Sequence, residues 1–117
     1  MPAASLDLTV EQGATYSQTM FYQTSNGTAI SLANCTLRMM ARESINANTT
    51  VLSLSTTNGG IVITNAANGS FALAISAGDT ANLSTGAYVY DLELVKPDTT
   101  VDRLLTGTLS VSGEVTR

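Results

Sequence analysis

The sequence predicts an all-β fold, a sandwich or a barrel of about seven to nine short strands. Three observations lead to this expectation. Apolar and polar residues alternate with a period of two along most of the 117 residues, as in strands with one buried face. Turn-forming residues interrupt the alternation at spacings of roughly 8–12 residues, which is typical of sandwiches and barrels. Hydrophobic residues make up 44% of the chain, enough for a packed core.

The strands expected in the N-terminal half are short alternating segments separated by turns. Gly13 ends the first of them. The pair Asn26-Gly27 predicts a hairpin turn, because it tolerates the positive φ angles of a type I′ turn. We expect strands at 6–10, 16–22 and 36–42, with a short extended piece at 30–32.

The C-terminal half continues this pattern and adds one helical segment. Residues 76–83 predict a helix of about two turns, because Ser76 can cap it and Asp79 suits its positive end. Pro97 favours a tight turn at 96–100. A glycine inside a strand often marks a bulge, so the last strand is expected to bend near Gly107. We expect a polar loop at 43–50 and strands at 51–55, 61–63, 71–75, 87–95 and 101–111. No change of composition marks a linker, so residues 1–117 are expected to form a single domain.

Charge and composition argue against several classes of function. Five Lys and Arg against nine Asp and Glu give a net charge of −4. Such a chain lacks a phosphate-neutralising surface, so we expect no nucleic-acid partner. No segment approaches the roughly 18 apolar residues of a spanning helix, so no membrane partner is expected. Because the chain has no His, it lacks the usual acid–base group. We therefore expect no enzyme, with no catalytic residue, cofactor or metal.

The N-terminus and the single cysteine indicate the compartment of synthesis. The first eight residues contain no basic segment and no apolar run, so we expect no signal peptide. Cys35 has no second cysteine to pair with, which fits a reducing compartment. A reactive thiol needs a nearby cation or His, and Arg38 is the only local candidate. We interpret Cys35 as a small, half-buried filler.

Two carboxylates are the strongest candidates for a charged site. Asp91 and Glu93 are two residues apart on an expected strand, so they point from the same face. They could contribute to a cation site, although Ca²⁺ usually takes six or more oxygens from a compact loop. We favour a solvated outer face on which a carboxylate lies opposite Arg103 across the hairpin.

The candidate interface residues come from two of the expected strands. If Met39 faces the core, Met40 faces outward between Arg38 and Arg42, and Met and Arg are enriched at protein contacts. The alternative is that the 43–50 loop buries Met40. Tyr16 and Tyr22 are expected to be surface aromatics, whereas Tyr88 and Tyr90 are expected in the core.

Several segments resemble small virion proteins of tailed bacteriophages. Residues 10–16, VEQGATY, are similar to their EQGATF-like opening, and residues 30–42, ISLANCTLRMMAR, to their DLTGYTARMQVR-like segment. The similarity continues through NGGI at 58–61, GAYVYDLEL at 86–94 and RLLTGTLSV at 103–111, and to EVTR at 114–117. Here Ser31-Leu32-Ala33-Asn34 replaces the usual Asp-Leu-Thr-Gly turn. The chain thus resembles the N-terminal domain of phage baseplate upper proteins.

This resemblance implies a fold and a role. The fold it implies is an immunoglobulin-like antiparallel β-sandwich, and the role is a non-enzymatic one in the tail, baseplate or fibre-attachment region of the virion. Partners would then be other virion proteins, in a multimeric assembly formed in the bacterial cytoplasm. One alternative is a capsid decoration protein bound to the major capsid protein of the head. A third possibility, from another class, is a glycan-binding module for host adhesion.

Overall fold

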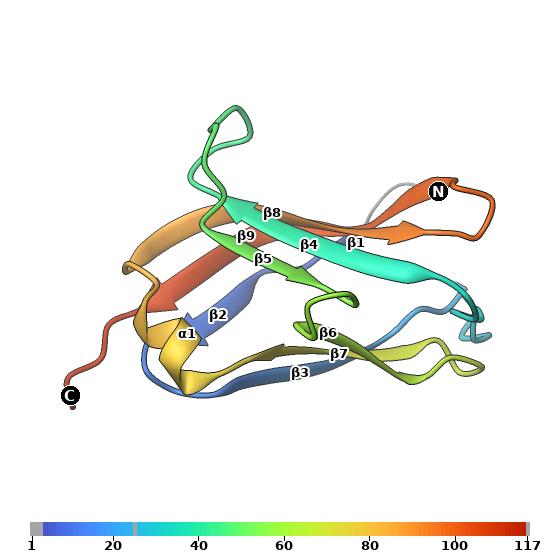
Figure 1. The fold of residues 1–117 in the computed structure, drawn as a ribbon, viewed down its shortest axis with the longest axis horizontal. Coiled ribbons are helices and arrows are strands. Elements are labelled where there is room, and N and C mark those ends of the chain that lie inside the picture. The colour runs from blue at the N-terminus through green and yellow to red at the C-terminus, as the bar shows by residue number, and fades with distance from the viewer. Residues whose placement is uncertain (1–3, 25, 117) are drawn as a thin grey trace.

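The computed structural model is a sandwich of two β-sheets, in line with the fold class expected from the sequence (Figure 1). It describes residues 4–24 and 26–116. Ser25, in the predicted Asn26-Gly27 hairpin, lies outside the described residues, as do residues 1–3 and 117 of the expected domain. The elements are β1 (Ala4–Ser5), β2 (Leu8–Glu11), β3 (Tyr16–Phe21), β4 (Thr36–Arg42), β5 (Leu52–Ser55), β6 (Ile61–Asn65), β7 (Ser70–Ile75), α1 (Ala77–Ala81), β8 (Gly86–Val95) and β9 (Val101–Ser112).

The strand order is that of an immunoglobulin-like sandwich. One sheet has the order β1-β9-β8-β4-β5, with β2 also on β9, and the other has the order β3-β7-β6. Strands β3, β7 and β6 correspond to B, E and D of the immunoglobulin fold, and β4, β8 and β9 to C, F and G. Both β1 and β2 run parallel to β9. Among the described residues, β1 and β2 both lie on the larger sheet, and no strand pairs with the outer edge of β3.

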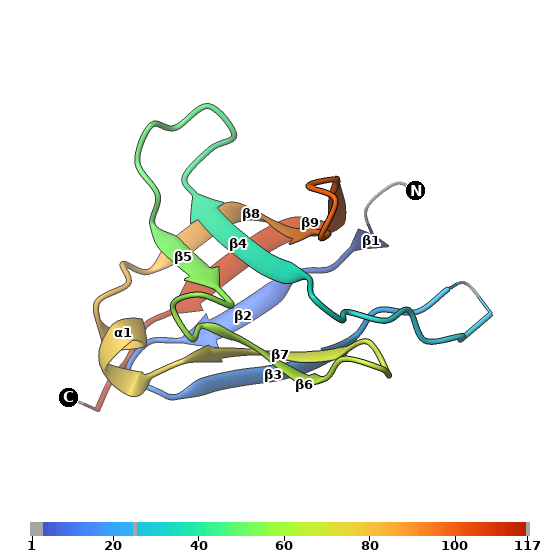
Figure 2. The same ribbon diagram turned by 45° about the vertical axis from the view of Figure 1, so that its right-hand side comes forward.

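The core lies between the two sheets and is formed by the apolar half of each alternating strand (Figure 2). The longest example is β8, where Tyr88, Tyr90, Leu92 and Leu94 are all buried and the residues between them are partly exposed. In β4 the buried residues are Leu37, Met39 and Ala41, which leaves Thr36, Arg38, Met40 and Arg42 on the outer side. The predicted core roles of Tyr88 and Tyr90 are confirmed.

The corner between β7 and β8 holds the short helix and a buried tyrosine. Ser76 caps α1 as expected, because its hydroxyl accepts a hydrogen bond from the Asp79 amide at 3.2 Å. Near the start of β8, the Tyr88 hydroxyl donates to the Ser84 carbonyl oxygen at 2.7 Å. A tyrosine that bonds back to the preceding corner in this way is the tyrosine corner of immunoglobulin-like domains.

The first expected strand, at 6–10, begins later in the structure. Its residues form β2 only from Leu8, because Leu6 and Asp7 connect β1 to β2, and Leu6 does not share the buried face of Leu8 and Val10. The reason is local hydrogen bonding: the Leu6 carbonyl oxygen accepts from the Tyr90 hydroxyl at 2.5 Å, and Asp7 accepts from the Thr108 amide at 3.0 Å. These bonds hold the connecting residues against the larger sheet.

The expected bend near Gly107 is wrong in position. The register between β8 and β9 shifts where Leu92 and Glu93 face Leu105 and Arg103, which leaves Leu104 as the extra residue. Gly107 has a different reason to be glycine. A Cβ atom there would lie 2.2 Å from the Leu6 carbonyl oxygen, so only glycine admits this close approach.

The expected piece at 30–32 is extended but is not part of a named strand. The Leu32 amide donates to the Ala66 carbonyl oxygen at 2.9 Å, and the Leu32 side chain is fully buried. The hairpin before it closes through the Thr24 amide and the Thr28 carbonyl oxygen at 2.8 Å, with Gly27 at φ +88.

Candidate interaction surface

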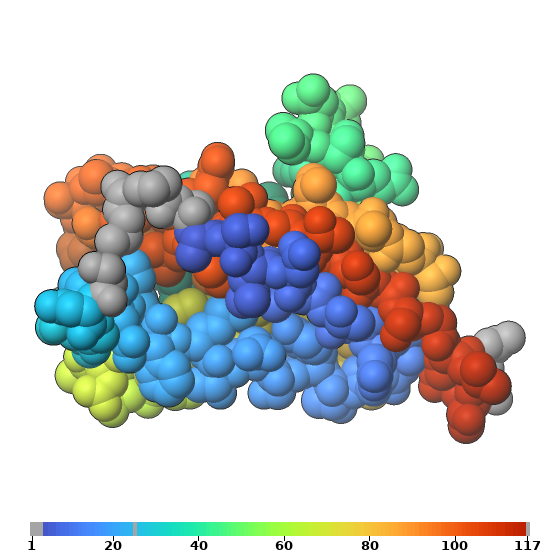
Figure 3. All heavy atoms as spheres, turned by 180° about the vertical axis from the view of Figure 1, so that it is seen from behind, coloured from blue at the N-terminus to red at the C-terminus, as the bar shows by residue number. Residues whose placement is uncertain are grey.

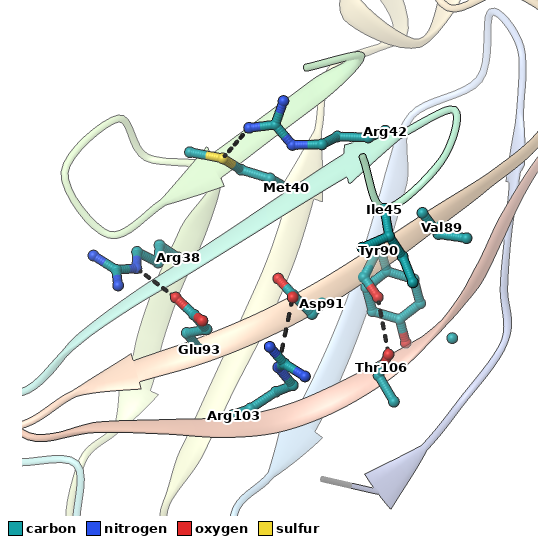
Figure 4. Close-up of a pocket in the computed structure, with 11 residues that line it drawn as sticks. Arg38, Met40, Arg42, Ile45, Val89, Tyr90, Asp91, Glu93, Arg103 and Thr106 are labelled. Atoms are coloured by element: carbon teal, nitrogen blue, oxygen red, sulfur yellow. Dashed lines mark hydrogen bonds and ion pairs between the residues drawn. The ribbon is translucent and has the colours of Figure 1, made fainter. Parts of the chain in front are cut away.

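The outer side of the six-stranded sheet gathers three of the predicted interface residues (Figure 4). Arg38, Met40 and Arg42 project from β4, because their neighbours along the strand fill the core. A shallow depression of about 420 Å³ lies over them. We call this the outer surface and define it by side chains from β4, β8, β9 and the 43–50 loop: Arg38, Met40, Arg42, Ile45, Val89, Asp91, Glu93, Arg103 and Thr106.

Two ion pairs order the charged part of the outer surface. Arg38 and Glu93 face each other across β4 and β8, and the Arg38 Nε lies 2.8 Å from Glu93 Oε1. The Arg103 Nε lies 3.6 Å from Asp91 Oδ2. The predicted arrangement, a carboxylate opposite Arg103 on an outer face, is confirmed. In the described part of the chain no group of three or more His, Cys, Asp or Glu residues could hold a metal ion.

Arg42 is the cation on this surface that has no carboxylate partner among the described residues. Its Nη1 donates to the Ala47 carbonyl oxygen at 3.1 Å, and its Nη2 lies 3.7 Å from the Met40 sulfur. The first bond ties the guanidinium to the loop, and the second places it beside an exposed thioether. Three arginines and two carboxylates leave the outer surface with one excess positive charge, in a chain whose net charge is −4.

Two exposed apolar side chains lie among these charges. Met40 is 40% exposed and Ile45 is 85% exposed. The 43–50 loop stands away from the sheet (Figures 1 and 2), so it does not bury Met40. Of the two alternatives for Met40, the structure shows the outward one.

Tyr16 and Tyr22 lie apart from the outer surface. They belong to β3 and the residue that follows it, in the other sheet, and both are half-buried against the core. Burial raises the pKa of the Tyr16 phenol above its ordinary value. They are thus less exposed than the sequence suggested, and any interface role for them stays a prediction.

Sequence reasoning missed Ile45 and the pairing of Arg38 with Glu93. Ile45 lies in a loop that was expected to be polar, and an isolated apolar residue there was the only signal. The pairing depends on the register of β4 against β8, which the alternation of each strand does not fix. Cys35 is half-buried, as expected, with its Sγ 3.5 Å from the Ala33 carbonyl oxygen.

Comparison with known proteins does not assign the chain to a family. No family model matches the chain, and a search of curated proteins gives no match either. Within the described residues, no helix is long and apolar enough to cross a membrane. The functional argument therefore rests on the sequence resemblance, the fold and the outer surface.

Proposed function

We propose that this chain is a structural protein of a tailed-phage virion, located at the tail, baseplate or fibre-attachment region. It acts through contacts with other virion proteins in a multimeric assembly and catalyses no reaction. Two lines support the proposal: the resemblance along nearly the whole sequence, and the immunoglobulin-like sandwich that this resemblance implied. The lack of histidine and the small number of charged residues fit a protein whose role is contact.

The observation that carries the proposal is the composition of the outer surface. Met40 and Ile45 expose apolar surface in a depression that Arg38, Arg42 and Arg103 also line. Protein interfaces favour this combination, because Met and Arg are enriched in them and a few such residues supply most of the binding energy. Arg42 adds a cation that a carboxylate on a partner would neutralise.

Cross-linking mass spectrometry on purified virions tests the location. We expect cross-links from this chain to tail, baseplate or fibre subunits. Cross-links only to the major capsid protein would overturn the tail location and favour a decoration protein of the head. Absence of the chain from purified particles, together with binding of the isolated domain to a host polysaccharide, would overturn the structural role and favour a glycan-binding module.

Paired variants test the surface itself. Met40→Asp and Ile45→Asp each place a carboxylate at an exposed apolar position of the outer surface, and we expect each to reduce incorporation into particles. Val62→Asp is the matched control, because Val62 is an exposed apolar residue on the other sheet. Equal loss of incorporation for all three variants, or none for any, would show that the outer surface has no special role.

A further inference from the structure

β3 is the edge strand whose hydrogen-bonding groups are least protected. It pairs with β7 on one side only, with unbroken register from Tyr16 to Phe21. Edge strands are usually guarded by charges, proline, bulges or short length, and the six residues of β3, YSQTMF, have no charge and no proline. The other edges are guarded: β6 has a register shift after Ile63, β5 has four residues, and β1 and β2 have two and four.

The hydrogen-bond ladder between β3 and β7 shows which backbone N–H and C=O groups of β3 point away from β7. The Tyr22 amide donates to the Gly69 carbonyl oxygen at 2.8 Å, in register with that ladder. Because direction alternates along an antiparallel strand, Ser17, Thr19 and Phe21 point their N–H and C=O groups away from β7. On the other side of β7, the Ala74 amide donates to the Gly60 carbonyl oxygen at 2.8 Å, which fits the same alternation. From the described residues, no hydrogen bond beyond this ladder reaches the backbone of 16–21.

An apolar groove runs beside this open edge, between the two sheets. Its volume is about 440 Å³, with β3 on one side and Leu6 and residues 102–105 of β9 on the other. Figure 3 looks onto this side of the molecule, with β3 in light blue below the orange and red of β9. The apolar residues that line the groove are Leu6, Met20, Tyr22, Phe71, Leu104 and Leu105. Here Leu6 is 39% exposed.

We propose that the open edge of β3 is a strand-addition site that takes an extended segment of a partner polypeptide with every second residue apolar. The added strand would lie beside β3, the B strand, where many immunoglobulin-like domains hold their first strand. The described residues of this chain form no strand there. Its backbone pairs with Ser17, Thr19 and Phe21, and its inward side chains enter the groove. In strand addition, main-chain bonds supply affinity and pockets for alternate side chains supply specificity.

The groove favours a partner segment over a second copy of this chain. If β3 paired with β3 of another copy, the inward side chains of both strands would stay in their own cores, and the groove would remain unfilled. A free extended segment has no core of its own and fills the groove with every second residue. This site shares only Arg103 with the outer surface and does not depend on the proposed function.

The probe for this site is a fluorescent peptide, Lys-Thr-Val-Thr-Val-Thr-Val-Thr-Lys, in which valines alternate with threonines. Its control replaces the central valine and the threonine after it by proline, which removes one amide from each edge of the peptide and disfavours the strand. We expect binding of the first peptide and at least about tenfold weaker binding of the second. In hydrogen exchange by NMR, the first peptide should slow the amides of Ser17, Thr19 and Phe21 and leave those of Gln18 and Met20 unchanged.

Two variants of the chain separate the edge from the groove. Thr19→Pro removes an outward amide without breaking the β7 ladder, and Leu6→Glu places a charge in the groove. Each should weaken peptide binding by about tenfold or more, because a lost strand bond or a buried unpaired charge opposes association. Ile45→Glu is the matched control on the outer surface and should bind within about twofold of the wild type.

Three results would overturn the proposal. One is equal binding of the two peptides. Another is that the first peptide saturates the chain but does not slow hydrogen exchange of the Ser17, Thr19 and Phe21 amides. The third is concentration-dependent dimerisation of the free chain with those amides already protected, which would assign the edge to a second copy. Sedimentation equilibrium without peptide distinguishes this last case.

Discussion

Tyr90 joins the centre of the larger sheet to the N-terminal segment through a single hydrogen bond. Its hydroxyl donates to the Leu6 carbonyl oxygen at 2.5 Å, at the point where β1 and β2 separate. Burial of the phenol, with smaller contributions from Tyr16 and Asp7, raises the pKa of Tyr90 to about 12. Tyr90 thus holds the segment between β1 and β2 against the larger sheet, and its phenol has a different pKa in the folded and unfolded states.

The raised pKa of Tyr90 predicts a loss of stability in alkali. An unfolded tyrosine has a pKa near 10, so the folded state holds the proton more tightly. The contribution of this group is complete below about pH 10 and is lost as the pH rises toward 12. We expect the free energy of unfolding, measured by urea denaturation at several pH values, to fall over this interval.

Tyr90→Phe isolates this contribution. At neutral pH the variant should be less stable by about 1 kcal/mol, because the bond to Leu6 is lost. Between pH 10 and 12 it should lose less stability than the wild type, and part of the decline should persist because the pKa of Tyr16 is also raised. Parallel declines for the two proteins would contradict the assignment.

At the scale of the elements, Thr80 connects α1 to the turn between β2 and β3. The side chain is fully buried. Its hydroxyl accepts from the Gly13 amide at 3.0 Å and lies 2.8 Å from the Ala14 carbonyl oxygen, to which it donates. A helix of five residues has little stability of its own, so this contact fixes its position.

Thr80→Val tests this connection, because valine has nearly the same shape and no hydroxyl. The change leaves the Gly13 amide and the Ala14 carbonyl without this partner, and each such group costs about 1–3 kcal/mol when buried. We expect thermal and urea unfolding to show a loss of roughly 2 kcal/mol or more. Thr57→Val, at an exposed turn position, should change stability by less than about 0.5 kcal/mol. Similar values for both variants would show that the hydroxyl is dispensable.

The elements also show what the sequence could predict and what it could not. Alternation predicted β4 and β8 with their buried faces. The spacing of Ser76 and Asp79 predicted the cap of α1. Both signals depend only on residues that are close in sequence. Alternation did not predict that β1 and β2 would both join β9, since alternation gives the buried face of a strand but not its partner. The extra residue at Leu104 and the approach of Leu6 to Gly107 were missed for the same reason.

The candidate sites show the same difference between features set by residues close in sequence and features set by how strands pair. The alternation of one strand placed Arg38, Met40 and Arg42 on the same side, but it left open whether the 43–50 loop would cover Met40. Ile45 belongs to a loop, where no period applies. The groove beside β3 depends on how far apart the two sheet edges lie, and no local pattern records that distance.

At the scale of the whole molecule, the two sheets share one core. Ile61 of the three-stranded sheet and Val111 of the six-stranded sheet both lie in it. Neither sheet has a second apolar layer, because the outer faces are largely polar in the described strands. A sheet separated from its partner would expose its buried face, so we expect the sandwich to unfold in one cooperative step.

Ile61→Val and Val111→Ala test this expectation from opposite sides of the core. Each removes buried apolar volume and should lower the free energy of unfolding by about 0.5–3 kcal/mol. Near-ultraviolet and far-ultraviolet circular dichroism should report the same midpoint in both variants, shifted down by several degrees. Val62→Ala, at an exposed position of β6, should leave the midpoint within about 2 °C. If Ile61→Val instead separated the two spectroscopic transitions, the three-stranded sheet would be a unit that melts first, and the single core would not be cooperative.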